Sequence, residues 1–284
     1  MGRRVLRRGD HWWFDVSRGV YANFPFHVPI VPDRHEITGL LAGRGLVARY
    51  CCPVEHGRRS FMYVCEDRDY CVDQLSNNTR SKVRRGLRRN DVRRIRPREL
   101  GQLGGIDLSR DTIARQGRRA PAGHDDYWNR YFQAADESDG FEAWGAFAGS
   151  RLAAFLLSCN IDGCVNIFIL RSHRDTLRDY PNNALIHEFL LDALSRPEIQ
   201  LVSYGWESIQ STLVSLDSFK VAMNFKRREI GQRVELNCWI RPLAGSRLIQ
   251  AVGQFAERRI QTERLGKLAG MVRWYSEQTK RTNA

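Results

Sequence analysis

Three apolar runs joined by two short turns constrain the fold of this chain more than any other feature. Phe141–Phe147, Leu152–Cys159 and Cys164–Leu170 each have the length and composition of a strand. The intervening turns, 148–151 and 160–163, each contain a glycine and are short enough for hairpins. The sequence therefore predicts an antiparallel meander in its second half.

Further helical and strand-like segments follow the meander and close a domain. In chain order they are Asn183–Leu194 (helix, opened by Pro181), Gln200–Tyr204 (strand), Ser211–Met223 (helix), Phe225–Ile230 and Val234–Ile240 (strands) and Ser246–Tyr275 (helical spacing). From Phe141 the order β-β-β-α-β-α-β-β predicts a mixed α/β fold with helices on both faces of a sheet.

A basic helix is predicted in the first half of the chain, after strand-like runs at Trp12–Val16, Gly45–Tyr50 and Phe61–Cys65. Between Val72 and Asn90, small or apolar residues recur at every fourth position, which is helical spacing. They are Leu75, Thr79, Val83 and Leu87. Ten of the nineteen residues from 80 to 98 are cationic. The bland interpretation of such a run is a solvated helix face, and the functional one is a phosphate-binding face.

Composition favours a globular protein with anionic partners. The 284 residues are 42% hydrophobic and carry a net charge of +13, with a pI near 9.8. No run approaches the ~20 apolar residues of a membrane-spanning helix, and no secretory signal is visible. The seven cysteines are odd in number and include the adjacent pair Cys51-Cys52, so we expect free thiols and a cytoplasmic protein.

Several familiar motifs are absent or misplaced. Gly43-x-Gly45-x-x-Ala48 precedes a strand-like run, whereas a dinucleotide site needs a helix there. Cys51, Cys52, His56 and Cys65 have no zinc-ligand spacing, so no metal is expected. No nucleophile motif is present either.

Three places could carry chemistry. Arg174 and Arg178 precede the helix that Pro181 opens, and a helix N-terminus with nearby guanidinium groups suits a pyrophosphate. The alternative is that Pro181 merely starts a core helix. Farther on, Glu207 follows a buried strand. Ligands of α/β sheets bind at the carboxyl ends of the strands, which would place Glu207 near a ligand. The alternative, that Glu207 is an ordinary surface glutamate after a strand, is equally compatible with the sequence. Lys220 could donate a hydrogen bond to an oxyanion.

The chain from 12 to 240 resembles the GNAT acyltransferases, and more closely their Fem-like branch, in which two such domains are fused. The basic helix within Tyr70–Arg89 resembles the helix that closes the first Fem-like domain, and Pro181–Leu185 resembles the start of the central helix in the second. Gln200–Gly205 followed by Leu216–Phe225 resembles the family's strand–glycine and Phe-Lys ending. The resemblance implies a truncated N-terminal GNAT-like half, residues 1–100, and a complete C-terminal GNAT domain, residues 101–284.

The resemblance also implies a site and a reaction. The Phe219-Lys220 pair matches residues tied to acyl transfer in the Fem-like branch, and two adjoining strands are expected to part and hold the donor carbonyl. We expect Lys220 or a strand amide to stabilise the oxyanion, and Glu207 to accept a proton, directly or through a water molecule. Residues expected to contact the substrate are Tyr204, Gly205 and Trp206.

The donor preferred from sequence is acyl-CoA, with a small-molecule or peptide amine as acceptor. Its pyrophosphate would contact Arg174, Arg178, Asn182, Asn183 and Ala184, although the glycines of the family's pyrophosphate motif are missing here. The first alternative donor is aminoacyl-tRNA, held by Arg80, Lys82, Arg84, Arg85 and Arg88. The second alternative is a basic nucleic-acid-binding protein without enzymatic activity.

Overall fold

The structure is a computed structural model that describes residues 4–115, 117, 119–209, 214–244 and 270–278. Its contacts divide the chain into two compact units, each discontinuous in sequence. The first unit contains Tyr63–Gly205 and Leu216–Arg227, and the second contains Arg3–Met62, Trp206–Ser215 and Arg228–Ala284. The domain boundary predicted at residue 100 falls inside the first unit. The two units are discontinuous and do not test the division into fused halves, residues 1–100 and 101–284, which stays a prediction.

The first unit is built on a mixed sheet with the strand order β5-β10-β9-β8-β7-β6. Its strands are β6 (Asp91–Ile95), β7 (Phe141–Ala148), β8 (Arg151–Ile161), β9 (Cys164–Ser172), β10 (Leu201–Trp206) and the end of β5 (Arg58–Cys65). Its helices are α2 (Asn77–Arg89), α3 (Gly105–Arg115), α4 (His124–Asp136), α5 (Pro181–Ser195) and α6 (Val214–Ala222), with short 3-10 helices at Val72–Gln74, Pro97–Leu100 and Arg174–Asp179. Strands β6 to β9 pair antiparallel, and β10 pairs parallel to β9.

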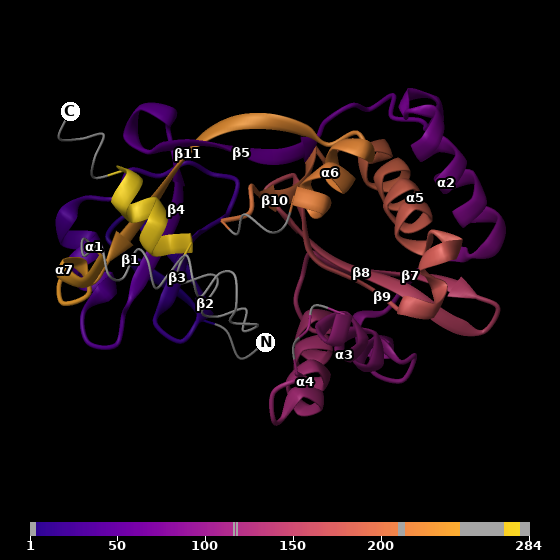
Figure 1. Cartoon of the computed structure of the whole chain (residues 1–284), viewed down its shortest axis with the longest axis horizontal. Coiled ribbons are helices and arrows are strands. Elements are labelled where there is room, and N and C mark those ends of the chain that lie inside the picture. The colour runs from indigo at the N-terminus through magenta and orange to yellow at the C-terminus, as the bar shows by residue number, and fades with distance from the viewer. Residues whose placement is uncertain (1–3, 116, 118, 210–213, 245–269, 279–284) are drawn as a thin grey trace. The chain divides into compact units, whose positions relative to one another are not determined.

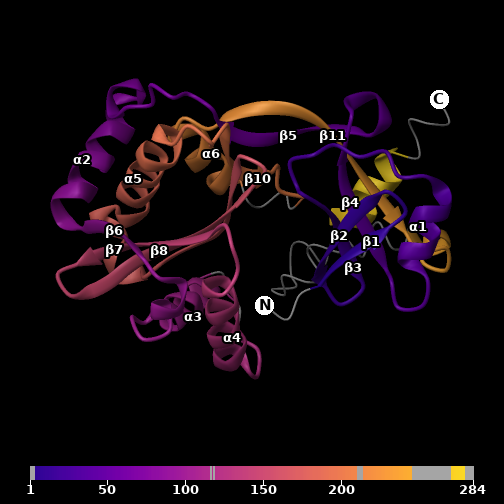
Figure 2. The ribbon, with the colours of Figure 1, turned by 180° about the vertical axis from the view of Figure 1, so that it is seen from behind.

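Helices cover both faces of this sheet (Figure 1). On one face, α5 buries Leu185, Phe189 and Leu190 in a core that α2 also enters through Val83. On the other face, α3 and α4 bury a second core around Phe132. The reverse view shows the same two layers of helices on either side of β7 and β8 (Figure 2). Helix α5 is buried over most of its surface, which agrees with its high content of apolar residues.

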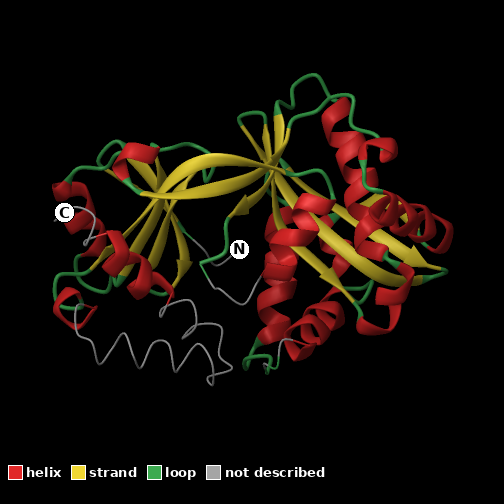
Figure 3. Cartoon of the chain, turned by 45° about the horizontal axis from the view of Figure 1, so that its top comes forward, coloured by secondary structure: helices red, strands yellow, loops and turns green. Residues whose placement is uncertain are grey.

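The second unit has the strand order β1-β2-β3-β4-β11-β5. Its elements are β1 (Val5–Arg8), β2 (His11–Ser17), β3 (Val20–Phe24), α1 (Arg34–Leu41), β4 (Val47–Cys52), the start of β5, β11 (Lys226–Leu236), α7 (Arg241–Ala244), a 3-10 helix at Val54–His56 and a helix over 270–278. Helix α1 packs its apolar side against Trp13 and Tyr50, and the helix at 270–278 contributes Met271 and Trp274 to a separate core with Val47. The strands and helices of this unit can be followed in Figure 3.

The predicted meander is confirmed as β7, β8 and β9, and the next helix and strand are confirmed as α5 and β10. One prediction is wrong. Phe225–Ile230 and Val234–Ile240 do not form two strands, because Gly231–Leu236 pairs without a break against Cys52–Val47 and makes one long strand, β11. Residues 245–269 of the predicted last helix lie outside the described residues, whereas 270–278 is helical. Strands β1 and β3 and helix α1 were not predicted.

The buried face of α2 differs from the predicted stripe. Thr79 and Val83 are buried as expected, but the third buried position is Gly86, and Leu87 is 36% exposed. The reason is the closeness of α5. A Cβ on Gly86 would lie 2.7 Å from the carbonyl oxygen of Tyr180 and 3.0 Å from the Cβ of Ala184. Only glycine lets α2 approach the first turn of α5 this closely.

Candidate active site

The parallel register of β9 and β10 is short. It joins Leu201–Ser203 to Cys164–Asn166, although both strands continue beyond these residues. Directly after Asn166, β9 carries a bulge, because Ser158 and Leu157 of β8 face Ile167 and Ile169 and leave Phe168 as the extra residue. A bulge bends its strand and interrupts pairing. The two strands therefore part beyond Asn166 and Ser203.

Lys220 lies beside this point with its charge buried. The residue is 3% exposed, and its Nζ lies 3.0 Å from Oδ1 of Asp217, one turn earlier on α6. The same Nζ lies 4.4 Å from the ring centroid of Tyr63 and 5.4 Å from that of Tyr204. Tyr204 directly follows the last β10 residue paired with β9. A carboxylate and two aromatic faces thus hold the ammonium group where the strands part.

The residues around Lys220 form one network that runs from the buried Tyr63 to the exposed Arg227. The Tyr63 hydroxyl is hydrogen-bonded to Asp217 and to Arg227. Burial and the charge of Asp217 raise the pKa of Tyr63, and burial raises the pKa of Tyr204. Both phenols are therefore neutral near pH 7. Sequence reasoning missed Asp217, although its i,i+3 spacing to Lys220 was visible. It had no means of finding Tyr63, which is 157 positions before Lys220 in the chain.

Phe219 belongs to the same unit as Lys220 and is half-buried against the core that contains Phe189 and Phe225. Its ring therefore supports α6. Tyr204 packs on Phe225 with a centroid separation of 5.4 Å, and Gly205 follows with a φ of +76°, a backbone conformation that favours glycine. The structure thus brings together Lys220, Phe219 and Tyr204 of the predicted residues.

Glu207 and Trp206 belong to the second unit. The Glu207 carboxylate accepts a hydrogen bond of 2.7 Å from Ser60 Oγ, and its backbone carbonyl accepts one of 3.0 Å from Arg49. The Arg49 guanidinium lies 5.0 Å from the ring centroid of Trp206, and burial lowers the pKa of Arg49 to about 10. The Trp206 indole donates to the carbonyl of Phe26. A shared task for Glu207 and Lys220 stays a prediction.

The start of α5 offers few free groups to a pyrophosphate. An ordinary helix N-terminus leaves its first amides without partners, and these amides bind anions. Here the Tyr180 amide donates to the carbonyl of Leu177, Pro181 has no N–H, and the Asn183 amide donates to the carbonyl of Tyr180. The Ala184 amide makes the ordinary first helical bond to the same carbonyl. Of the first helical turn, the amide of Asn182 remains available to an anion.

The side chains predicted to surround that pyrophosphate are mostly engaged elsewhere. Arg174 donates to the Asp111 carboxylate from its backbone N (2.9 Å) and from its Nε (2.5 Å). Asn183 is buried and donates to the sulfur of Met223 at 3.4 Å. Ala184 is fully buried beneath Gly86. Arg178 is exposed.

Helix α2 presents cations without any acidic residue between Asn77 and Arg89. Arg80 and Arg84 contact Asp73, whereas Lys82 and Arg85 lie within 6 Å of the ring centroid of Tyr180. Among the residues that the structure describes, Arg88 and Arg89 have no carboxylate within 4 Å. The end of α2 therefore carries positive charge that the described protein does not neutralise.

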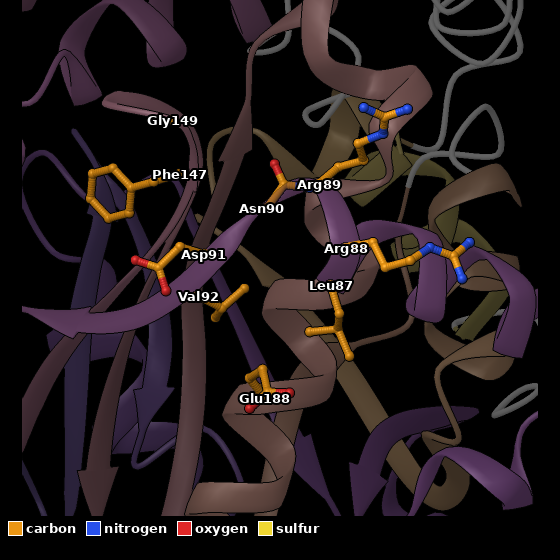
Figure 4. A pocket seen from close by; sticks show the side chains of 9 residues that line it. All are labelled: Leu87, Arg88, Arg89, Asn90, Asp91, Val92, Phe147, Gly149 and Glu188. Carbon is orange, nitrogen blue, oxygen red and sulfur yellow. The ribbon is translucent and has the colours of Figure 1, made fainter.

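A hollow of about 510 Å³ adjoins the end of α2 (Figure 4). It is lined by Leu87, Arg88, Arg89, Asn90, Asp91, Val92, Phe147, Gly149 and Glu188. In Figure 4 the guanidinium groups of Arg88 and Arg89 extend away from Phe147. Burial raises the pKa of Glu188. Neither Lys220 nor Tyr204 lines this hollow, so it is distinct from the place where β9 and β10 part.

In the described part of the chain, no cluster of three or more His, Cys, Asp or Glu side chains is arranged to hold a metal ion. No helix within those residues has both the length and the apolar character needed to cross a bilayer.

Solved structures share this fold. The match to FemX covers 90% of this chain and 90% of FemX, with a TM-score of 0.56 and 11% sequence identity. L-PGS from Bacillus licheniformis matches 92% of this chain over 90% of its own (TM-score 0.50, 12% identity). The match to the C-terminal domain of a putative lysylphosphatidylglycerol synthetase from Agrobacterium fabrum covers 82% of this chain and 84% of that domain (TM-score 0.50, 11% identity). No protein-family model and no curated protein matches the sequence. The predicted fold is confirmed: the chain has a mixed α/β fold of the GNAT type, which it shares with FemX.

Proposed function

We propose that the protein transfers an aminoacyl group from aminoacyl-tRNA to the amine of a small molecule or peptide. The observation that carries this proposal is the early end of the β9–β10 register beside the buried Lys220 ammonium. Parted strands expose backbone groups that can hold an acyl carbonyl, and a nearby buried cation stabilises the oxyanion that forms from it. The fold shared with FemX supports the same chemistry.

The reaction is written as a direct displacement. The acceptor nitrogen forms a bond to the carbonyl carbon of the ester, and Lys220 donates a hydrogen bond to the resulting oxyanion. The ester C–O bond then breaks, and a proton lost by the amine ends on the departing ribose oxygen. No covalent enzyme intermediate is required. Removing one oxyanion donor typically lowers kcat by about 10²–10³-fold, which sets the expected contribution of Lys220.

Aminoacyl-tRNA is preferred to acyl-CoA for two structural reasons. The first turn of α5 has few unbonded amides for a CoA pyrophosphate, and α2 packs directly on it through Gly86. Helix α2 also carries six cations and no acid, which suits a phosphate backbone. These features favour the second of the two donors considered from sequence.

A transfer assay with both donors tests the proposal. A pool of tRNA charged with ¹⁴C-labelled amino acids is incubated with the protein and an extract of small amines and peptides as acceptors. We expect label to move from tRNA into a product, and we expect prior RNase treatment to abolish this transfer. Transfer from [¹⁴C]acetyl-CoA together with none from tRNA would overturn the choice of donor. Salt-sensitive RNA binding with no transfer from either donor would support the non-enzymatic alternative.

A further inference from the structure

The ion pair on α6 is unusual because it is shielded from water. The Lys220 side chain is 4% exposed and the Asp217 side chain 15% exposed. Burying an ammonium group away from water disfavours its charged form unless a counter-charge is held close to it. Asp217 supplies that counter-charge at 3.0 Å, within the geometry of a charge-assisted hydrogen bond.

Asp217 is itself fixed from a second direction. The Tyr63 hydroxyl bonds to Asp217 and also to Arg227 at the start of β11, so the carboxylate is held from α6, β5 and β11 together. Among the described residues, the charged and titratable groups that face Lys220 include Asp217 on α6, Tyr63 on β5 and Tyr204 on β10, and Arg227 lies 5.9 Å from the ring centroid of Tyr63. Asp217 is the acidic member of this set.

We propose that Asp217 is a positioning residue of the transfer reaction. Its carboxylate keeps the Lys220 amine protonated and holds Nζ between Tyr63 and Tyr204, where the amine can donate to the donor carbonyl at the parted strands. This inference rests on the proposed function. Asp217 acts through Lys220 and does not itself touch the reacting atoms.

The pH dependence of transfer separates this role from a merely structural one. An ammonium donor loses activity as pH rises through its titration, and a nearby carboxylate moves that loss to higher pH. We therefore expect Asp217→Asn to lower kcat by 10-fold or more at pH 8 with KM unchanged. We also expect it to move the alkaline limb of the pH–rate profile to lower pH by about one pH unit or more. An unmoved alkaline limb would overturn the proposal, even if stability falls.

Two further variants keep the experiment decisive. Tyr63→Phe keeps the ring beside Lys220 and removes the hydroxyl that fixes Asp217, so a loss of about 3- to 10-fold in kcat is expected, the equivalent of one hydrogen bond. Asp107→Asn is the matched control, because Asp107 pairs with Arg110 at the same i,i+3 spacing on the exposed surface of α3. It should leave the rate and the pH profile unchanged.

An NMR titration measures the pairing of Lys220 with Asp217 and does not depend on transfer activity. The chain contains five lysines, so a spectrum of ¹³Cε-labelled lysine contains five signals, and Lys220→Arg identifies the one of interest. We expect the Lys220 signal to titrate at lower pH in Asp217→Asn than in wild type or Asp107→Asn. An unchanged titration overturns the assignment of Asp217. A moved titration in a protein that transfers nothing from charged tRNA overturns the proposed function while leaving the pairing intact.

Discussion

Replacing Gly86 by alanine tests whether α2 covers the first turn of α5 as closely as the structure has it. The added Cβ would lie 2.7 Å from the Tyr180 carbonyl oxygen and 3.0 Å from the Ala184 Cβ. The first neighbour is backbone and the second is a single methyl group, so neither can turn aside and a helix must shift. Overpacking of this kind costs about 1–3 kcal/mol, against a gain of about 1 kcal/mol from the better helix propensity of alanine.

We expect Gly86→Ala to lower the free energy of unfolding by about 1–2 kcal/mol, because contact with a backbone oxygen places the packing cost in the upper part of its range. Urea unfolding followed by tryptophan fluorescence measures the change. Gly39→Ala is the matched control: Gly39 lies in α1, and a Cβ there meets nothing within 4 Å. It should stabilise by about 0.5–1 kcal/mol. If Gly86→Ala stabilises as much as Gly39→Ala, α2 does not cover α5, and the packing argument against a CoA pyrophosphate fails.

Other measurements probe the buried histidine and the basic helix. Burial lowers the pKa of His187, so its contribution to stability is complete above its unfolded value near 6.5 and is lost as pH falls below it. The urea midpoint of wild type should therefore fall between pH 7 and 5 more steeply than that of His187→Gln; parallel curves would contradict this. Replacing Arg88 and Arg89 together by glutamine should weaken tRNA binding in filter assays and reduce the salt slope by about two. The same change at the exposed Arg7 and Arg8 of β1 should do neither, and equal effects of the two pairs would refute a special role for α2.

The regular elements of the first unit were predictable because each repeats a local pattern. The meander shows in three apolar runs, and α5 shows in an apolar segment opened by Pro181. Two adjoining strands were also expected to part, although the sequence did not indicate which strands. The physical cause of this parting could not be predicted from the sequence, because the bulge at Phe168 is a property of the β8–β9 register. Gly86 was hidden for a similar reason: only the packing of α5 shows why Gly86, and not Leu87, lies on the buried face of α2.

The candidate site was half predictable. Lys220 and Phe219 follow from the family's Phe-Lys pair, whereas the network around Lys220 depends on distant parts of the chain. Tyr63 reaches Lys220 from β5, and a single sequence contains no signal for that contact. The predicted pyrophosphate site illustrates the opposite case. Pro181 correctly marks the start of α5, yet the hydrogen bonds that occupy the amides of its first turn appear only in three dimensions.

The most direct test of the central claim is single-turnover transfer from charged tRNA by wild type and by Lys220→Met. The methionine keeps an unbranched apolar side chain and removes the ammonium that lies between Tyr63 and Tyr204. With tRNA affinity and far-UV circular dichroism unchanged, we predict a transfer rate at least 10²-fold below that of wild type. A folded Lys220→Met protein that transfers its aminoacyl group at the wild-type rate would contradict the account.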